Sequence, residues 1–386
     1  MANNPIGPLT DADEGFHHQV ADTFAIVGTS DPAWTEKVCA MAMSRDGSLQ
    51  FGFGMGRYPN RNVLDGYAAS SRGAEQMTVR GSRSLAADPG STAVGPIHYE
   101  VLEPMRRVRF VLEPNEIQPI AFDLEFEAVV PPRLEERTHL RDQFRVMADL
   151  VRYHQTGVAS GWAEVDGERI AVDRDSWVCT RDHSWGVRYD VGPPTTDRGD
   201  TTAFPPGVGF MMMWCPALLE RADGSRYAIH LHFTLVEMTG FTQKTVTAGV
   251  EHTDGTVEPI VDLRPDLLFH EGNRRLLGGT VTGTMADGSR RPFQLEVLGD
   301  TGVHLGAGLY FGFDGHHHGE WRGDFHLDGE RIPDCRPDDV ARRLHQIRDT
   351  TVRVSDPVGG GVGVGNCQVI AAGPWPDLGL ADDTWL

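Results

Sequence analysis

Several features that would place a chain at or across a membrane are absent here. The 386 residues contain no uninterrupted apolar stretch of about 18 residues, the length that a membrane-spanning helix requires. The N-terminus, Met1-Ala2-Asn3-Asn4-Pro5, has neither the basic segment nor the apolar segment of a secretory signal. The sequence therefore predicts a soluble, cytoplasmic protein without a membrane span.

Closely spaced cysteines are also missing. The chain has five cysteines, and no two of them form a C-x-x-C pair. They are Cys39, Cys179, Cys215, Cys335 and Cys367. An odd number of widely separated thiols argues against a disulfide framework and against a structural zinc site.

Concentrated positive charge is lacking as well. Aspartate and glutamate outnumber lysine and arginine by 55 to 35, which gives a formal net charge of −20. No basic run is longer than Arg106-Arg107 or Arg290-Arg291. A phosphate backbone would be repelled by such a surface, so nucleic acid is not an expected partner. A nucleophilic serine is not indicated either, since no G-x-S-x-G motif occurs.

What the chain does contain is a succession of short alternating segments separated by turns. Val38–Ser44 precedes the turn Arg45-Asp46-Gly47, and Leu49–Arg57 follows it with alternating apolar residues, a pattern that predicts a β-hairpin. Further Asp-Gly turns stand at positions 223, 254, 287, 314 and 328. This spacing predicts antiparallel sandwiches or barrels, and the absence of a βαβ pattern excludes a parallel dinucleotide-binding fold.

Two segments are expected to be helical. Leu134–Gln155 is the plausible helix of the first half, and Asp338–Asp349 has apolar residues at helical spacing. The chain exceeds the ~250–300 residues at which single cores stop growing. We therefore expect two domains, residues 1–195 with an N-terminal arm at 1–35, and residues 205–386. The Gly- and Pro-rich stretch between them places a ligand cleft near the domain boundary.

The segment Arg181–Arg188 brings an acid, an imidazole, an indole and two guanidinium groups together. Asp182 is either an ion-pair partner or, if it faces an apolar cleft, a proton donor near neutral pH. In a regular strand His183 and Trp185 face away from Asp182, so all three serve one cavity only if a turn or bulge intervenes. Trp185 either offers its ring face to a developing cation or is a structural residue.

Two histidine clusters stand in the second half. His230 and His232 share one face of a predicted strand, and with Glu237 beyond them their spacing approximates the first metal motif of the cupins. The alternative is a pair of hydrogen-bonded histidines in a cavity. Three consecutive histidines end at His318 and cannot all face one ion in an extended strand. We expect His318 and Trp321 to line the cleft instead.

On the Asp182–Gly186 segment and, less distinctively, on Phe122–Val130, the chain resembles the superfamily of the carotenoid 1,2-hydratases (hydroxyneurosporene synthases) and the attachment-protein-like family. The resemblance extends from about Trp34 to about Gly329. It implies two lipocalin-like β domains side by side, no organic cofactor and a pocket for a hydrophobic, often isoprenoid, substrate. Hydratases of this group are thought to protonate an alkene and let water capture the resulting carbocation.

The resemblance implies roles for three residues, with Asp182 as the acid, Trp185 as the π-face for the cation and His183 as the group that positions water. The chain departs from the hydratases in the strand that follows. They carry a tyrosine and an aspartate there, whereas Phe210–Trp214 has neither and instead contains three methionines. Methionines suit a deformable apolar wall around a bulky substrate.

We therefore predict an all-β protein of two lipocalin-like domains that acts as a cofactor-independent lyase. It would hydrate or dehydrate an alkene of an isoprenoid or aryl small molecule, with Asp182, His183 and Trp185 as catalytic residues. The residues expected to bind substrate are Arg188, Met212, Trp214, Tyr227, His230, His232, His318 and Trp321. The alternatives are a lipophile-binding protein, an isomerase, a cyclase or a carbon–carbon lyase, and a metal enzyme at His230, His232 and Glu237. The sequence leaves a homo-oligomer open.

Overall fold

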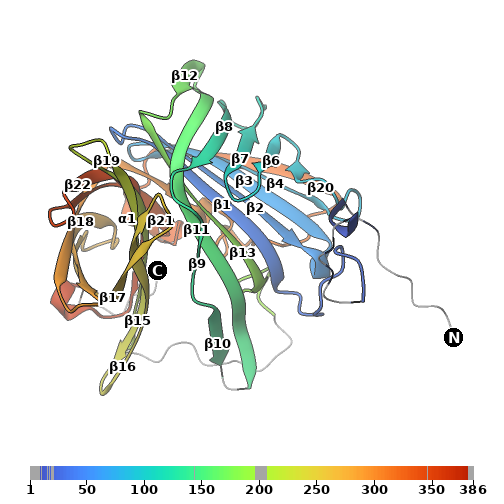
Figure 1. Cartoon of the computed structure of the whole chain (residues 1–386). Coiled ribbons are helices and arrows are strands. Elements are labelled where there is room, and N and C mark those ends of the chain that lie inside the picture. Colours follow the sequence, from blue (N-terminus) through green and yellow to red (C-terminus); the bar gives the residue numbers. More distant parts are fainter. Residues whose placement is uncertain are drawn as a thin grey trace.

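The strands of this protein form two sheets, one open and strongly curved and the other closed into a barrel (Figure 1). The computed structural model describes residues 9, 11–14, 16, 18, 21–142, 144–195, 207–345 and 347–380. The predicted all-β, lipocalin-like architecture is confirmed. The predicted connection between the domains lies mostly in 196–206, outside the described residues.

The curved sheet is antiparallel throughout. In spatial order its strands are β20 (Phe325–Ile332), β4 (Glu75–Ser84), β3 (Val63–Arg72), β2 (Gln50–Tyr58), β1 (Trp34–Ser44), β13 (Trp177–Val187), β11 (Arg145–Val165), β8 (Ile120–Ala128), β7 (Arg107–Leu112), β6 (Ile97–Glu103) and β5 (Ala93–Val94). Three further strands pair with β11, namely β9 (Arg133–Leu134), β10 (Thr138–Asp142) and β12 (Glu168–Val172). The edge strand β20 comes from the second half of the chain, so both halves build this sheet.

The barrel is built by the second half alone. Its strands are β14 (Gly209–Arg221), β15 (Arg226–Met238), β16 (Phe241–His252), β17 (Val257–Phe269), β18 (Leu276–Met285), β19 (Arg290–His304), β21 (Arg348–Asp356) and β22 (Gly361–Ala372). The helical elements are α1 (Asp338–Arg343) and the 3-10 turns Asp11–Glu14, Pro59–Arg61, Leu305–Gly308 and Pro376–Leu378. In the part of the chain that the structure describes, no helix has the length and apolar character needed to cross a bilayer.

The predicted hairpin at the start of the chain is confirmed. β1 and β2 pair in antiparallel register, with Ala42 opposite Phe51 and Ala40 opposite Phe53. The turn between them contains Gly47 at a φ of +73°. A left-handed backbone of this kind costs glycine least, which is why the Asp-Gly pair predicts the turn correctly.

The predicted helix at Leu134–Gln155 is wrong. β9, β10 and most of β11 occupy this region instead, and β11 pairs with β13 on one side and β8 on the other. Around Ala148 and Leu150 burial follows the two-residue period of a strand. Strand pairing on both sides therefore overrides the weak helical spacing of the segment.

The second predicted helix, Asp338–Asp349, is only half as long as expected. α1 ends at Arg343, and His345 adopts a φ of +53°, the left-handed conformation that commonly terminates helices. The chain then enters β21 at Arg348. As a result Asp349 lies in a barrel strand rather than at the end of a helix.

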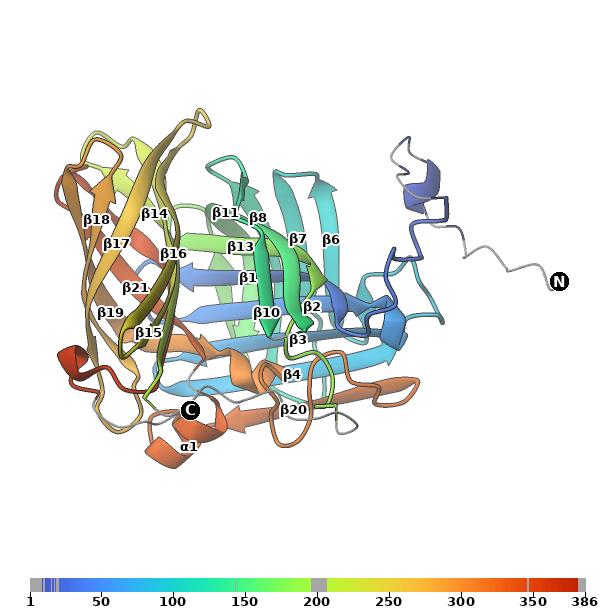
Figure 2. The same cartoon turned by 90° about the horizontal axis from the view of Figure 1, so that it is seen from below.

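The three largest apolar cores among the described residues lie in the curved sheet, in the barrel and between them. One fills the inner face of the curved sheet, around Phe53, Phe110 and Phe122, and a second fills the barrel. The third lies between the two sheets and joins side chains of the curved sheet, such as Met43, to barrel residues such as Ile370. We call the sheet surface that carries this third core the outer face. Figure 2 shows the barrel beside the curved sheet.

Truncation of Phe122 should destabilise the fold strongly. The ring is fully buried and lies 5.3 Å from Phe51 and 6.2 Å from Phe110 between centroids. Phe122→Ala should lower the free energy of unfolding by roughly 3–5 kcal/mol in urea denaturation. The matched control is Phe241→Ala on the barrel surface, where the side chain is 48% exposed and truncation should cost little. Equal losses in the two variants would contradict this packing.

Candidate functional site

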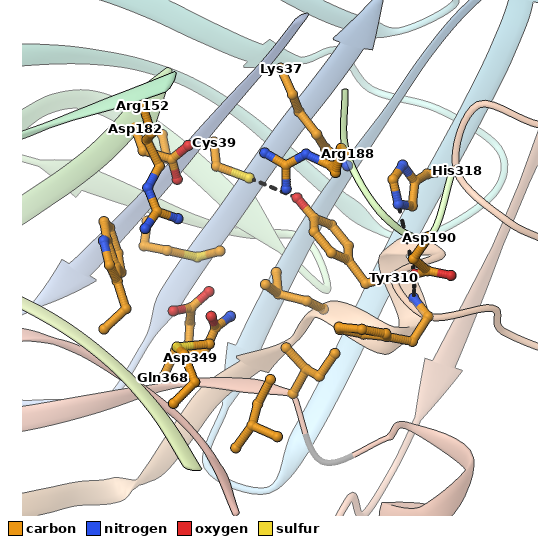
Figure 3. Close-up of a pocket in the computed structure, with 18 of the residues that line it drawn as sticks. Lys37, Cys39, Arg152, Asp182, Arg188, Asp190, Tyr310, His318, Asp349 and Gln368 are labelled. Atoms are coloured by element: carbon orange, nitrogen blue, oxygen red, sulfur yellow. Dashed lines mark hydrogen bonds and ion pairs between the residues drawn. The ribbon is translucent and has the colours of Figure 1, made fainter. Parts of the chain in front are cut away.

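A cavity of about 110 Å³ lies between the outer face of the curved sheet and the outer wall of the barrel (Figure 3). Its lining residues are Lys37, Cys39, Ala40, Met41, Arg152, Thr180, Arg181, Asp182, Arg188, Tyr189, Asp190, Met212, Trp214, Leu305, Tyr310, Phe311, His318, Ile347, Asp349, Gln368 and Ile370. The rings of Tyr189 and Phe311 lie 6.1 Å apart and are partly exposed, which places them at the solvent side.

Strand β13 distributes the predicted catalytic residues over both faces of the curved sheet. It pairs with β1 and with β11 without a register shift, so no bulge interrupts it. Alternation then points Asp182 towards the barrel, where it lines the cavity. His183 and Trp185 point the other way and are not among the lining residues. The three predicted catalytic residues therefore do not share one cavity.

On the inner face, His183 and Trp185 belong to a separate polar and aromatic group. His183 Nε2 lies 2.9 Å from Glu36 Oε1, and its Nδ1 lies 3.3 Å from the hydroxyl of Tyr153. Trp185 is 38% exposed and meets the rings of Tyr153 and His183 edge to face. The predicted roles of these two residues at the reacting centre are therefore corrected, because the sheet separates them from Asp182.

Four of the residues predicted to bind substrate line the cavity: Arg188, Met212, Trp214 and His318. Tyr227 does not. Alternation along β15 turns it into the barrel core, where its buried hydroxyl donates a 2.7 Å hydrogen bond to Asp356.

Three other predicted site residues also lie away from the cavity wall. Trp321 is 47% exposed and is not among the lining residues. His230 and His232 project from the outer wall of the barrel, one layer behind Trp214. The predictions of direct substrate contact by Tyr227, Trp321, His230 and His232 are therefore not met in this geometry.

Asp349 is an acidic cavity residue that the sequence analysis missed. It is 4% exposed, and its Oδ1 accepts a 2.7 Å hydrogen bond from Asn366 Nδ2. Burial raises its pKa to about 7, against the Asn366 hydrogen bond and with the help of the nearby charge of Asp182. The β-branched run Thr350–Val354 is a strand signal that could have revealed it, but the predicted helix ended in this region.

The second cavity carboxyl, Asp182, has different neighbours. Burial raises its pKa, while the charges of Arg152 and Arg188 act in the opposite direction. Asp349 has no such cation among the causes of its shift. The cavity thus holds two carboxyl groups whose surroundings differ in charge, which is the usual arrangement for dividing acid and base roles.

A third carboxyl stands near the solvent side. Asp190 accepts a hydrogen bond from the backbone N–H of Phe311 and lies 3.9 Å from His318 Nε2. Burial raises the pKa of Asp190 to about 6 despite that hydrogen bond. Burial also holds the pKa of His318 well below its usual value, so this imidazole is neutral at pH 7.

Lys37 and Arg188 bring positive charge to the cavity. The Lys37 ammonium lies 3.8 Å from the ring centroid of Tyr310, and the side chain is 3% exposed. Burial lowers the pKa of Lys37, partly opposed by Asp65. Arg188 Nη2 donates a 2.6 Å hydrogen bond to Ser184 Oγ, while its Nε is buried without a hydrogen-bond partner among the described residues.

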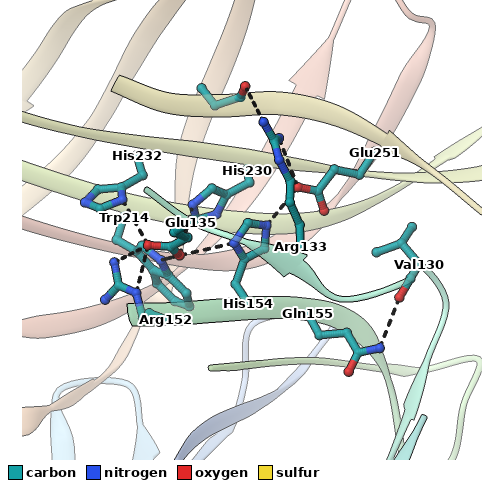
Figure 4. Close-up of polar contacts among 11 residues, drawn as sticks. Val130, Arg133, Glu135, Arg152, His154, Gln155, Trp214, His230, His232 and Glu251 are labelled. Atoms are coloured by element: carbon teal, nitrogen blue, oxygen red, sulfur yellow. Dashed lines mark hydrogen bonds and ion pairs between the residues drawn. The ribbon is translucent and has the colours of Figure 1, made fainter. Parts of the chain in front are cut away.

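Behind Trp214, a buried network joins the curved sheet to the barrel (Figure 4). His154 of β11 lies between two carboxylates, with Nδ1 3.1 Å from Glu135 Oε1 and Nε2 2.8 Å from Glu251 Oε1. Arg152 and Arg133 flank this trio and pair with Glu135 and Glu251 respectively. Burial alone would lower the pKa of His154, but the two carboxylates outweigh it and raise the pKa.

The same network contains the candidate metal ligands. Ligand atoms of Glu135, His230 and His232 lie within 4.8 Å of one another. However, Arg152 donates to Glu135 Oε2 at 2.8 and 2.5 Å, and Trp214 donates to Oε1 at 3.0 Å. With His154 also at Oε1, the carboxylate has little acceptor capacity left, and a metal ion would face the guanidinium.

The carboxylate of Glu135 is therefore committed to Arg152, Trp214 and His154 rather than available to a metal ion. Glu237, the acid predicted to complete a metal site, is exposed near the end of β15 and takes no part. The alternative expected from the sequence, a pair of hydrogen-bonded histidines in a cavity, is not met either, because both ring nitrogens of His230 and Nδ1 of His232 are buried without a hydrogen-bond partner among the described residues.

The chain is similar to one protein family and to several solved structures. A model for a family of unknown function (DUF8625) matches residues 9–381. No curated protein matches the sequence. Among solved structures, a candidate AttH of Nitrosomonas europaea is 12% identical, with 87% of this chain and 91% of that chain covered and a TM-score of 0.49.

Two further solved structures are similar at the same level. CghA with Sch210972 is 12% identical, with 88% of each chain covered and a TM-score of 0.47. Kievitone hydratase of Nectria haematococca is 12% identical, with 89% of this chain and 92% of that chain covered and a TM-score of 0.37.

The His154 network should make stability depend on pH. A histidine whose pKa is raised in the folded state contributes stability that is fully present below its unfolded pKa of about 6.5 and is lost as pH rises through the folded value. Urea titrations should therefore show the wild type losing stability above about pH 6.5, whereas His154→Gln should show a flatter profile in that range. At pH 6 the variant should be less stable by roughly 3 kcal/mol, because one partner of a buried ion pair is removed.

His252→Gln is the matched control. His252 lies on the barrel strand β16, is partly exposed and pairs with Glu258 at 2.8 Å. Its loss should shift the free energy of unfolding only slightly. A steep wild-type pH dependence that persists in His154→Gln would show that another group is responsible.

Proposed function

Since this chain belongs to the family of unknown function DUF8625, whose description assigns no activity, we propose a function from the cavity itself: a lyase that adds water to, or removes it from, a carbon–carbon double bond by acid–base catalysis. The observation that carries this proposal is Asp349, a buried carboxyl with a pKa of about 7 in the same cavity as a second carboxyl, Asp182. Water addition needs one group that gives a proton and another that takes one.

Asp349 suits the role of the acid. A carboxyl that is still partly protonated at neutral pH can transfer its proton to carbon, which a fully ionised aspartate cannot. Its Oδ1 is held by Asn366, whose Oδ1 in turn accepts a 2.5 Å hydrogen bond from Thr180. This chain of contacts runs from the barrel to β13 and fixes the orientation of the carboxyl.

Asp182 suits the role of the base. The charges of Arg152 and Arg188 favour its ionised form and oppose the effect of burial. An ionised Asp182 can accept a proton from a water molecule that attacks the double bond. The two carboxyls come from different sheets, so the reacting atoms would lie between the curved sheet and the barrel.

The apolar part of the lining indicates that the substrate is hydrophobic. Met212 and Ile370 come from the barrel wall, Met41 comes from β1, and Leu305 and Ile347 lie beside them. These side chains exclude water from the acid and make its proton transfer more effective. We propose that a small ring or alkenyl group occupies this half of the cavity, with the rest of a larger substrate leaving past Tyr189 and Phe311.

Replacement of Asp349 tests the acid. Asp349→Asn should keep the hydrogen bond to the neighbouring amide side chain and lower kcat by roughly 10²–10⁴-fold. The wild-type rate should fall as pH rises through about 7, because the acid must be protonated, and the residual rate of the variant should lack this step. Asp262→Asn on the exposed barrel wall is the control and should retain full activity.

The raised pKa of Asp349 can also be tested without a substrate. In the folded state Asp349 keeps its proton up to about pH 7, whereas in the unfolded state it loses the proton near pH 4. The wild type should therefore lose stability relative to Asp349→Asn between about pH 4 and pH 7. Equal pH dependence of unfolding in the two proteins would contradict the assignment of a protonated Asp349.

The reaction itself is tested by mass spectrometry in water enriched in heavy oxygen. Tag-free protein is incubated with pooled prenylated phenols, terpenoids, aryl alkenes and aryl enones. A product that gains one labelled water in wild type but not in Asp349→Asn would support the lyase. A ligand retained without change of mass would favour a lipophile-binding protein, and an unlabelled isomer would favour an isomerase or cyclase.

A further inference from the structure

Two positively charged side chains face the space that a substrate would occupy. Lys37 and Arg188 both line the cavity, and neither has a carboxylate within ion-pair distance among the described residues. The other two cavity arginines are already engaged. Arg152 pairs with Glu135, and Arg181 donates to Gln155 Oε1 at 3.0 and 2.7 Å.

Two aromatic rings of the cavity lining, those of Tyr310 and Trp214, already have a cation beside them. The Lys37 ammonium lies over the ring of Tyr310 at 3.8 Å, and the Arg152 guanidinium lies 5.7 Å from the ring centroid of Trp214. A carbocation is normally stabilised by a free π-face. Here two such faces already bind a positive charge. A carbocation that developed beside either ring would therefore be repelled by Lys37 or Arg152.

The same charges favour a developing anion. Figure 3 shows Lys37, Arg188 and Tyr310 together on one side of the cavity, with Asp349 and Gln368 on the other. Arg188 Nε is a buried donor without an acceptor in the part of the chain that the structure describes, and such a donor gains most from a ligand oxygen. Hydrogen bonds from cations to an oxyanion are among the strongest available in a dry site.

We propose that Lys37 and Arg188 form an oxyanion site, and that the substrate is an alkene conjugated with a carbonyl group rather than an isolated isoprenoid alkene. This inference rests on the proposed lyase function and names its substrate class. The carbonyl oxygen would face the two cations, and the double bond would lie between Asp182 and Asp349.

The water-addition step balances with these groups alone. Asp182 takes a proton from water as the water oxygen bonds to the β-carbon, and the π electrons of the double bond move onto the carbonyl oxygen as an enolate. Lys37 and Arg188 hold that charge. Asp349 then protonates the α-carbon, the carbonyl re-forms, and a proton returns from Asp182 to Asp349 through solvent. The net change is the addition of one water molecule.

The oxyanion site is testable without turnover, with 4-nitrophenol as the probe, because its ionised form absorbs visible light. The titratable groups around the two cations are Cys39, Asp65, Asp182, Asp190, Tyr310 and His318. In wild type the bound phenol should ionise at lower pH than in solution. Lys37→Met and Arg188→Gln should each weaken binding of the phenolate by roughly tenfold or more and remove this shift.

Lys244→Met is the matched control for the lysine. Lys244 lies on the barrel surface and pairs with Asp262 at 2.6 Å. Its replacement should leave phenolate binding unchanged. Lys37→Arg keeps the charge and should retain most of the spectral shift. If bound nitrophenol ionises no more readily than in solution, or if Lys37→Met binds the phenolate as wild type does, the oxyanion site is rejected.

A paired turnover assay separates this inference from the proposed function. An aryl enone and the aryl alkene that lacks the carbonyl are compared in heavy-oxygen water. Addition to the enone alone, lost in Lys37→Met, supports both. Faster addition to the plain alkene overturns the inference and leaves the lyase standing. Phenolate binding with no addition to either alkene retains the oxyanion site and rejects the lyase.

Discussion

The structure depends on how the curved sheet and the barrel bury charge between them. An open sheet and a closed barrel can be joined by apolar contacts, and Met43, Val178 and Ile370 make such contacts here. Yet the same interface contains His154 with Glu135 and Glu251 on either side of it. A buried charge is costly unless it is paired, so these residues favour few relative positions of the two sheets.

The same network shapes one wall of the cavity. Arg152 pairs with Glu135 on one side and lines the cavity on the other, and Trp214 does the same through its indole N–H. These two side chains therefore form a common wall. The network sets the distance between the sheets, and that distance decides how close a barrel residue such as Asp349 comes to Asp182.

The alternation of side chains along a strand explains why the proposed acid and the proposed base come from different sheets. A single strand presents neighbouring side chains to opposite faces, so β13 cannot bring Asp182 and His183 into one cavity. A cavity between two sheets can collect the outward-facing side chains of both. The resulting site is rich in cations on one side, apolar on another and supplied with two carboxyls, a combination that no local motif encodes.

Much of the local structure could be predicted from the sequence. The Asp-Gly turns at 46, 223, 254 and 287 marked strand ends, whereas Asp328-Gly329 lies inside β20. Alternation around Phe51 and Phe53 identified a hairpin. The alternation rule also separated Asp182 from His183 in advance. The failures occurred where the local pattern was weak, as in the β11 region that was predicted to be helical. There, pairing with β8 and β13 decided the outcome.

The candidate site was less accessible to sequence reasoning. Arg188, Met212, Trp214 and His318 do line the cavity, but Asp349, Lys37 and Tyr310 were not singled out. These three residues stand far apart in the chain and carry no motif. Their roles arise from neighbours on other strands, such as Asn366 beside Asp349 and the ammonium over the ring of Tyr310.

The sequence by itself determined the all-β architecture and the set of residues that share each strand face, because turn chemistry and a two-residue period are local properties of the chain. Only the tertiary structure decided which face meets the barrel, which carboxyl loses its solvent and which cations remain without a carboxylate. Those outcomes depend on burial and on distances between strands that are remote in sequence, and the closure of one sheet against the other sets both at once.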